Sequence, residues 1–463
     1  MNEMRKNTRQ VFWLLFLLFA LLSAYLAKFL AVDAPAISTS SLNPRLLIDR
    51  TAIDRGDILS ADGAFLAYSE NGERHYPLEE AAAHITGYAD YQRAGFAAVE
   101  AKANFRLQKA SLEMVQRITG LFTQKKPKGD SVVLTVDSDL QTLAYEGLKG
   151  KKGAVVIVEP STGKILAMVS APSFDPNEAS ANWATLSKDA DTSPLLNRAA
   201  QGLYPPGSIF KIATSVAILE NIPEAKTTTV NCEGTQIFSS KKLSCFNKNV
   251  HGTVNLESAF AVSCNIYFAS MGLKVGPTKL SETANKLMFN TAIPFDLDAS
   301  ISSFQLDKNS LERDILDSSI GQGKTMATPL HMALLASSVA NGGIMMSPYI
   351  IDHYVSYNGQ SHTKRMPSML STPFTQEESN VLSQMMKSAV DYGTATKAAV
   401  SGIDIAAKTG SAETSNNQTH GWLVAFGPYE NPKWALCAIV ENAGGSSAIL
   451  PMCKKLIEKL AKL

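Results

Sequence analysis

The chain has 463 residues, enough for two or three domains of ordinary size. Apolar residues make up 45% of the chain and charged residues 18%, a globular balance that excludes a protein dominated by disorder. With 43 basic and 42 acidic side chains the formal charge is +1. The chain therefore lacks the excess of positive charge that nucleic-acid binding needs.

The first segment is strongly apolar. The run Gln10–Ala27 carries no charge and is long enough as a helix to approach the roughly 30 Å thickness of a bilayer core. It is preceded by three basic residues: Arg5, Lys6 and Arg9. This positive excess predicts a cytoplasmic tail over 1–9, a transmembrane anchor over 10–32 and an extracytoplasmic remainder, that is, a single-pass plasma-membrane protein. A cleaved signal peptide is the alternative, although such peptides have shorter apolar regions and end in an Ala-x-Ala-like site that fits poorly here.

The rest of the chain divides at a polar linker. Residues 33–44 are rich in Ala, Ser and Pro and are predicted to form a stalk. Short strand-like and helical pieces follow until Thr123–Asp130, whose Pro and Gly mark a boundary. We therefore expect a membrane-proximal domain over 33–130 and a larger domain over 131–463.

The larger domain has an α+β pattern. Apolar, β-branched runs separated by turn residues predict two antiparallel hairpins: 153–159 with 164–171, and 421–426 with 434–440. Helical spacing predicts, in chain order, Ser208–Glu220, Leu256–Val262, Pro329–Ala340 and Met452–Leu463. The last helix should pack on the sheet.

Ser208 and Lys211 are the first candidates for chemistry. Positions i and i+3 share one helix face, so the hydroxyl and the amine are held within reach of each other. A buried lysine with a lowered pKa can serve as a base, and the helix start supplies backbone NH groups for an oxyanion. The same Ser-x-x-Lys spacing recurs at Ser161, Ser239 and Ser361, but only Ser208 follows Pro-Pro-Gly and opens an apolar helix.

Two further segments carry polar groups in suggestive surroundings. Ser263 and Asn265 lie between two apolar helical pieces, where the serine can relay a proton and the amide can hold a substrate amide. Lys408, Thr409 and Gly410 form the chain's only Lys-Thr-Gly, predicted on an edge strand. There the lysine and the hydroxyl can grip a carboxylate, and the glycine lets the backbone approach a ligand. Each motif alone is equally consistent with a structural role.

The five cysteines belong to an exported chain, where disulfides are permitted. Our first expectation is a disulfide between Cys232 and Cys245, which flank a polar loop. A zinc site made by Cys232, Cys245 and His251, with Cys264 as an optional fourth ligand, is the alternative, because the ligand types suit zinc although the spacing lacks tight C-x-x-C pairs. Cys264 is expected to be an inert apolar side chain.

Taken together and in order, Ser-x-x-Lys, Ser-x-Asn and Lys-Thr-Gly form the signature of penicillin-interacting serine enzymes. The stretches LLNRAAQGLYPPGSIFKIATSVAILE, IGQGKTMATPLHMALLASSVANGG and HGWLVAFGP resemble the monofunctional class B penicillin-binding proteins. Upstream, RGDILSADGAFLAYS resembles the membrane-proximal domain of that family in a short-armed version. The resemblance implies a penicillin-binding/serine β-lactamase-like transpeptidase domain, with an antiparallel sheet flanked by helices, beside a smaller membrane-proximal domain and one transmembrane helix.

The resemblance also implies an activity, that of a D,D-transpeptidase that crosslinks peptidoglycan in the cell wall. Ser208 would attack the penultimate D-alanine carbonyl of a stem peptide, and Lys211 would activate it. Ser263 would shuttle the proton, and Asn265 would orient the peptide.

The Lys-Thr-Gly strand would bind the substrate end. Lys408 would supply positive charge that lowers the pKa of Lys211, and Thr409 with Ser411 would hold the terminal carboxylate beside Gly410. Backbone NH groups of Ser208 and Ser411 would form the oxyanion hole. Penicillins and other β-lactams would acylate Ser208.

Other functions share these motifs. A D,D-carboxypeptidase or a β-lactamase would use the same site, and a scaffold for a wall-polymerising complex would not need it. The resemblance implies a SEDS-family glycosyltransferase in the membrane as a partner, alongside peptidoglycan stem peptides. Nothing in the sequence calls for a cofactor or a catalytic metal.

Overall fold

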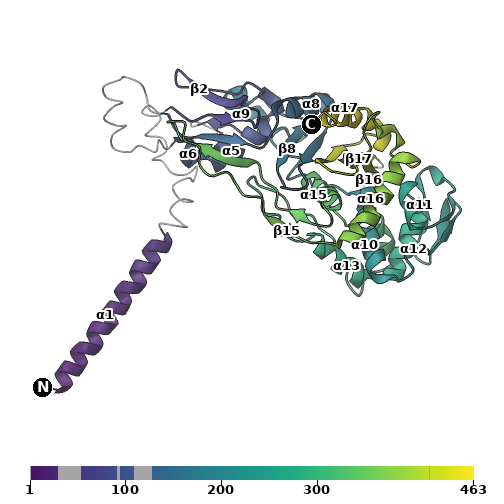
Figure 1. Cartoon of the computed structure of the whole chain (residues 1–463), viewed down its shortest axis with the longest axis horizontal. Coiled ribbons are helices and arrows are strands. Elements are labelled where there is room, and N and C mark those ends of the chain that lie inside the picture. The colour runs from purple at the N-terminus through teal and green to yellow at the C-terminus, as the bar shows by residue number, and fades with distance from the viewer. Residues whose placement is uncertain are drawn as a thin grey trace.

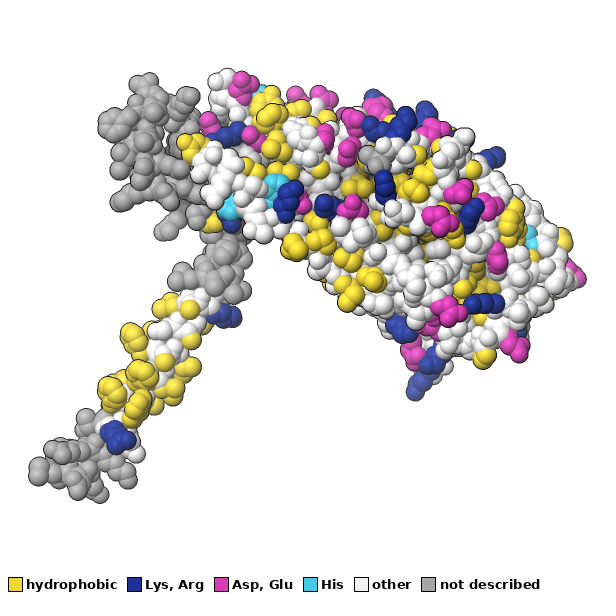
Figure 2. All heavy atoms as spheres, in the orientation of Figure 1, with side chains coloured by type: hydrophobic (Ala, Val, Ile, Leu, Met, Phe, Trp, Pro, Cys, Tyr) yellow, Lys and Arg dark blue, Asp and Glu magenta, His cyan; other side chains and the backbone are white. Residues whose placement is uncertain are grey.

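The structure is a computed structural model that describes residues 2–29, 54–90, 94–108, 128–414, 416 and 418–462. The predicted stalk, the end of the predicted anchor and most of the predicted linker lie outside the described residues. The chain begins with helix α1 (Asn2–Lys28). Its stretch Arg9–Lys28 is long and apolar enough to cross a membrane, and none of it is buried against the protein. Figure 2 shows apolar side chains along this helix.

A first sheet belongs to the membrane-proximal part of the molecule. Its strand order is β14-β6-β1-β2-β3. Their bounds are β1 (Ile58–Leu59), β2 (Phe65–Glu70), β3 (Glu73–His75), β6 (Ser131–Leu134) and β14 (Ile351–Val355). β1 runs parallel to β6, and the other neighbours are antiparallel. Since β6 and β14 follow the predicted linker in sequence, the two parts of the chain share this sheet.

Short elements follow β3 in the chain. They are η3 (Glu79–Ala81), α4 (Ala83–Thr86), β4 (Ala89–Asp90), β5 (Gly95–Phe96), α5 (Ala98–Lys102) and α6 (Asn104–Gln108). Figure 1 shows α5 and α6 at the end of the molecule opposite α11 and α12.

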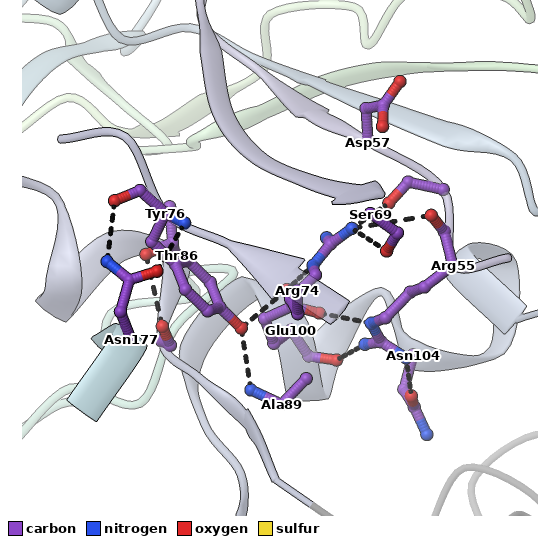
Figure 3. Close-up of polar contacts among 12 residues, drawn as sticks. Arg55, Asp57, Ser69, Arg74, Tyr76, Thr86, Ala89, Glu100, Asn104 and Asn177 are labelled. Atoms are coloured by element: carbon purple, nitrogen blue, oxygen red, sulfur yellow. Dashed lines mark hydrogen bonds and ion pairs between the residues drawn. The ribbon is translucent and has the colours of Figure 1, made fainter. Parts of the chain in front are cut away.

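A buried ionic cluster joins α5 to β3 and to the segment before β1. The carboxylate of Glu100 accepts hydrogen bonds from Arg55 Nε at 2.5 Å, Arg74 Nε at 2.7 Å and the Tyr76 hydroxyl at 3.1 Å. Figure 3 shows both guanidinium groups directed at Glu100. Burial raises the pKa of Glu100, but the two arginines outweigh it and hold the pKa below its usual value. The carboxylate therefore stays charged and paired inside the domain.

The second sheet forms the centre of the larger domain. Its order is β16-β17-β18-β7-β8, antiparallel throughout. The bounds are β7 (Gly153–Val158), β8 (Ile165–Ala171), β16 (Ala406–Glu413), β17 (Thr419–Gly427) and β18 (Trp434–Val440). Both predicted hairpins are thus confirmed, and the Lys-Thr-Gly strand lies at an edge of the sheet as predicted.

Side chains alternate between two apolar layers on the faces of this sheet. Val155 and Ile157 pack with α8 (Ser138–Leu148) and α17 (Leu450–Leu460), whereas Val156 and Val158 pack with α15 (Pro329–Ala340). Figure 1 shows α8 and α17 on one side of the sheet and α15 on the other. The terminal helix therefore packs on the sheet as predicted.

Further helices and small hairpins surround the central sheet, and most of them lie on its α15 side. The helical elements are η4 (Pro176–Glu178), α9 (Ala179–Leu186), η5 (Gly207–Phe210), α10 (Lys211–Asn221), η6 (Phe246–Lys248), α11 (Leu256–Ala261), α12 (Asn265–Val275), α13 (Pro277–Lys286), α14 (Glu312–Ser319), α16 (Gln376–Asp391), η7 (Thr396–Ala398) and η8 (Ser446–Ala448). The short strands are β9 (Val230–Cys232), β10 (Thr235–Ile237), β11 (Lys242–Ser244), β12 (Gly252–Val254), β13 (Met345–Met346) and β15 (Met369–Ser371). The predicted helix 329–340 has the predicted bounds, but the one predicted from Ser208 begins as a 3-10 turn.

Candidate active site

Ser208 lies in a tight turn pressed against the edge strand. Pro206 precedes η5, and Gly207 adopts φ 54°, a left-handed conformation that only glycine takes without strain. A Cβ atom on Gly207 would lie 2.6 Å from the carbonyl oxygen of Ser411 in β16. The missing side chain thus lets the Ser208 turn approach the Lys-Thr-Gly strand.

A tryptophan fixes this turn from the other side. Trp422, fully buried in β17 opposite Gly410, donates its indole NH to the carbonyl oxygen of Pro205 at 3.0 Å. A Cβ on Gly410 would come within 3.0 Å of the Ile209 side chain. Two glycines, one from each segment, therefore make the contact possible.

Lys211 joins the first motif to the second. Its fully buried ammonium nitrogen Nζ donates to the Ser263 carbonyl oxygen at 2.8 Å, the Ser263 hydroxyl at 3.1 Å and Asn265 Oδ1 at 2.8 Å. Burial lowers the pKa of Lys211 to about 8, against the opposing effect of the nearby Cys264 and Cys245 thiols. A fraction of roughly one in ten is then unprotonated at pH 7, as a general base requires.

The second motif sits at the junction of two helices. α11 ends at Ala261 and α12 begins at Asn265, with the Cys264 sulfur accepting from the Tyr267 backbone NH as its cap. Ser263 has φ 57°, unusual for a residue with a side chain and typical of strained functional sites. Asn265 also donates from Nδ2 to the Ser244 carbonyl oxygen at 3.0 Å, so both ends of its amide are held.

The third motif presents its polar groups from β16. Lys408 is fully buried and donates to the Thr409 carbonyl oxygen at 3.0 Å. Burial first, and then repulsion from Lys211, lowers the pKa of Lys408 well below its usual value. This repulsion indicates that the two amines lie in one region. The sequence led us to expect that Lys408 lowers the pKa of Lys211, whereas in the structure burial lowers it and the repulsion acts on Lys408.

Two partners of the third motif escaped the sequence analysis. Thr409 Oγ1 lies 2.5 Å from the Thr394 hydroxyl, and Ser411 Oγ accepts from the Ser446 backbone NH at 3.2 Å. Neither Thr394 nor Ser446 belongs to a recognisable motif, because both are adjacent only through the fold. They orient the hydroxyl groups that the sequence assigns to carboxylate binding.

The disulfide expected between Cys232 and Cys245 is wrong in this structure. Both are free buried thiols whose sulfur atoms lie 3.6 Å apart, well beyond bonding distance. Cys264 is likewise not an isolated apolar group, since its sulfur lies 3.8 Å from Cys245 Sγ. With His251 these residues form a group able to hold a metal ion.

The structure thus brings together a serine turn, a buried lysine, a Ser-x-Asn junction and a Lys-Thr-Gly edge strand. This is the arrangement of motifs found in the serine enzymes that react with penicillin. Residues 153–458 match the family model for the penicillin binding protein transpeptidase domain, and residues 55–132 match that for the penicillin binding protein A dimerisation domain.

Relatives of the whole chain agree with these matches. The peptidoglycan D,D-transpeptidase PbpA of Mycolicibacterium smegmatis is 33% identical, covering 95% of this chain and 94% of the relative. The imipenem acyl-enzyme complex of penicillin-binding protein A from Mycobacterium tuberculosis superposes with a TM-score of 0.82 at 30% identity, covering 89% of this chain and 99% of that one. The D,D-transpeptidase domain of a peptidoglycan glycosyltransferase from Eggerthella lenta gives a TM-score of 0.81 at 29% identity, with the same coverage. The chain belongs to the penicillin-binding protein transpeptidase family.

Proposed function

We propose that this protein is a serine D,D-transpeptidase that crosslinks peptidoglycan stem peptides through an acyl-enzyme on Ser208 and that β-lactams acylate the same residue. The observation that carries the proposal is the position of Lys211. Its buried Nζ contacts Ser263 and Asn265, while the turn that bears Ser208 packs on the Lys-Thr-Gly strand. Relatives named as D,D-transpeptidases and neighbours captured as acyl-enzymes support the same chemistry.

The first half-reaction forms the acyl-enzyme. Unprotonated Lys211 takes the hydroxyl proton of Ser208 as Oγ bonds to the penultimate D-alanine carbonyl carbon. Backbone NH groups of Ser208 and Ser411 stabilise the oxyanion, a contribution often worth about 3 kcal/mol per donor. The carbon–nitrogen bond then breaks, and Ser263 passes the proton to the departing D-alanine amine.

The second half-reaction reverses these roles. An amine of a neighbouring stem peptide attacks the ester carbonyl, loses a proton through the same relay, and displaces Ser208 Oγ, which is reprotonated. Asn265 holds the donor peptide amide, and Thr409 with Ser411 holds the terminal carboxylate beside the Lys408 amine. If water replaced the amine, the same residues would perform the carboxypeptidase or β-lactamase reaction.

Labelling with a fluorescent penicillin tests the nucleophile. Ser208→Ala should abolish labelling, and Lys211→Ala should slow it by about a hundredfold or more, the usual contribution of a general base. Ser161→Ala is the matched control, because Ser161 has the same Ser-x-x-Lys spacing but lies in an exposed turn. Undiminished labelling of Ser208→Ala would refute the assignment.

The lifetime of the label separates the alternatives. A transpeptidase should keep the penicillin adduct through many minutes of washing, whereas a β-lactamase should release hydrolysed penicillin continuously. Supplying a pentapeptide donor with and without an amine acceptor then distinguishes crosslinking from carboxypeptidase hydrolysis.

The same proposal extends to location and partners. Residues 1–9 face the cytoplasm, α1 with residues up to 32 anchors the chain, and both the domain 33–130 and the domain 131–463 lie outside. A SEDS-family glycosyltransferase is the membrane partner, and the transpeptidase crosslinks the glycan polymer that the glycosyltransferase makes. Protease treatment of intact spheroplasts tests the topology, and co-purification from detergent tests the partner.

A further inference from the structure

We infer that Cys232, Cys245, Cys264 and His251 form a structural zinc site, the Cys3His site. All four donor atoms lie within 4.8 Å of one another. Three sulfurs and one imidazole nitrogen are a donor set that favours zinc among the common metals. The inference goes beyond the proposed function and does not depend on it.

Three of the six distances between donor atoms match the edges of a tetrahedron. With Zn–S near 2.3 Å and Zn–N near 2.0 Å, tetrahedral zinc sets two sulfurs about 3.8 Å apart and a sulfur and a nitrogen about 3.5 Å apart. Cys232 Sγ lies 3.6 Å from Cys245 Sγ and 3.4 Å from His251 Nδ1, and Cys245 Sγ lies 3.8 Å from Cys264 Sγ. A disulfide would need sulfurs about 2.05 Å apart and would use only two of the four donors.

The backbone prearranges three of the ligands. Cys232 ends β9, and the His251 NH donates to its carbonyl oxygen at 3.1 Å where β9 meets β12. Cys245 follows β11, and its NH donates to the Gly234 carbonyl oxygen at 2.9 Å. Cys264, the cap of α12, brings the fourth donor from a different element. All three cysteines are buried, so the donors are shielded from solvent.

The strands that carry the cysteines are short and are only partly buried in the apolar core, through Leu243 and Val254. β9–β12 and β10–β11 are two-stranded sheets of three residues per strand, a size that is marginally stable alone. Ile237, Phe246 and Val250 are exposed here rather than packed in a core. Small units of this kind are usually stapled by a metal or by disulfides.

The Cys3His site is also linked to the catalytic residues through the backbone at Cys264. Cys264 stands between Ser263 and Asn265, whose side chains both contact Lys211 Nζ. Fixing the Cys264 sulfur on a metal restrains the left-handed turn at Ser263 and the first turn of α12. The Cys3His site therefore positions the second motif without touching substrate.

Metal content of the full chain, purified in detergent from zinc-supplemented cells, tests the inference. We expect one zinc ion per chain in the wild type. The zinc content should be at least tenfold lower in Cys232→Ser and in His251→Ala. Cys453→Ser is the matched control, since Cys453 is an equally buried free thiol on α17 outside the site, and it should keep its zinc. Cobalt added to zinc-free wild type should give the visible absorption of a tetrahedral thiolate complex, and Cys232→Ser should not.

Two results would overturn the site, independently of any penicillin labelling. One is wild-type protein that binds neither zinc nor cobalt while its thiols remain free. The other is a disulfide among Cys232, Cys245 and Cys264 found by peptide mapping under non-reducing conditions. A chain that holds zinc but takes up no penicillin would instead refute the proposed function alone.

A chelator tests the positioning role. Removing zinc from the wild type should slow acylation by a fluorescent penicillin about tenfold or more, and zinc alone should restore the rate. The Cys453→Ser control should respond as the wild type does. An acylation rate that is unchanged after complete zinc removal would contradict the link to Ser263 and Asn265.

Discussion

Replacing Gly207 by alanine should separate the two halves of the active site while leaving the domain folded. The new Cβ would lie 2.6 Å from the Ser411 carbonyl oxygen, so reaching a close C···O contact of roughly 3.3 Å requires a shift of about 0.7 Å. The neighbour is backbone of the edge strand, which cannot rotate away as a flexible side chain could. A displacement of this order near reacting groups costs on the order of a hundredfold in rate. The alanine also takes up a left-handed conformation, which costs about 1–2 kcal/mol.

The assay is the second-order rate of acylation by a fluorescent penicillin, with thermal unfolding measured in parallel. Gly402→Ala is the matched control, because Gly402 has φ 85° in the same domain but has no atom within 4 Å of its Cβ position. It should lose similar stability and keep its acylation rate. If folded Gly207→Ala reacts as fast as Gly402→Ala, close contact between the serine turn and β16 is not required for catalysis.

Three further outcomes follow from the same structure. Because the pKa of Lys211 is lowered to about 8, the rate of acylation should rise about tenfold per pH unit below that pH and level off above it. A rate that stays constant from about pH 6 to about pH 9 would contradict Lys211 as the base. Thr409→Val should lower acylation efficiency by about ten- to a hundredfold, the worth of a hydrogen bond to a charged group, and an unaltered rate would remove Thr409 from carboxylate binding. Glu100→Gln should lower the free energy of unfolding by about 3–5 kcal/mol in chemical denaturation, because it removes the buried carboxylate that both arginines contact. The control Glu282→Gln, at an exposed ion pair, should change it by under about 1 kcal/mol. Equal effects of the two variants would refute a stabilising role for the buried cluster.

Local patterns predicted much of the fold. The two hairpins of the central sheet, the edge position of the Lys-Thr-Gly strand and the bounds of α15 follow from apolar runs and turn residues within single segments. The sequence did not predict that β14 (Ile351–Val355) pairs with β6, because that contact joins residues more than two hundred positions apart. The 3-10 turn over Gly207–Phe210 was also missed, since it depends on the contact of Gly207 with Ser411.

The residues of the candidate site also fall into those that the sequence predicts and those that only the fold brings together. Ser208, Lys211 and the Lys-Thr-Gly strand could be found because recognisable residues follow one another at fixed spacing. Thr394 has no such signal, and its hydroxyl meets Thr409 only in the folded chain. The cysteines misled for a related reason: the spacing of Cys232 and Cys245 favoured a disulfide over the alternative zinc site, whereas the fold brings His251, just before β12, and Cys264, at the cap of α12, close to both sulfurs.

Peptide mapping of the penicillin adduct tests the central claim most directly. After brief exposure of the full chain to benzylpenicillin, mass spectrometry of the digest should find the penicilloyl mass on Ser208 alone, in a peptide that Ser208→Ala leaves unmodified. An adduct on any other residue, or folded protein that forms none, would contradict an active site built on Ser208, Lys211 and the Lys-Thr-Gly strand.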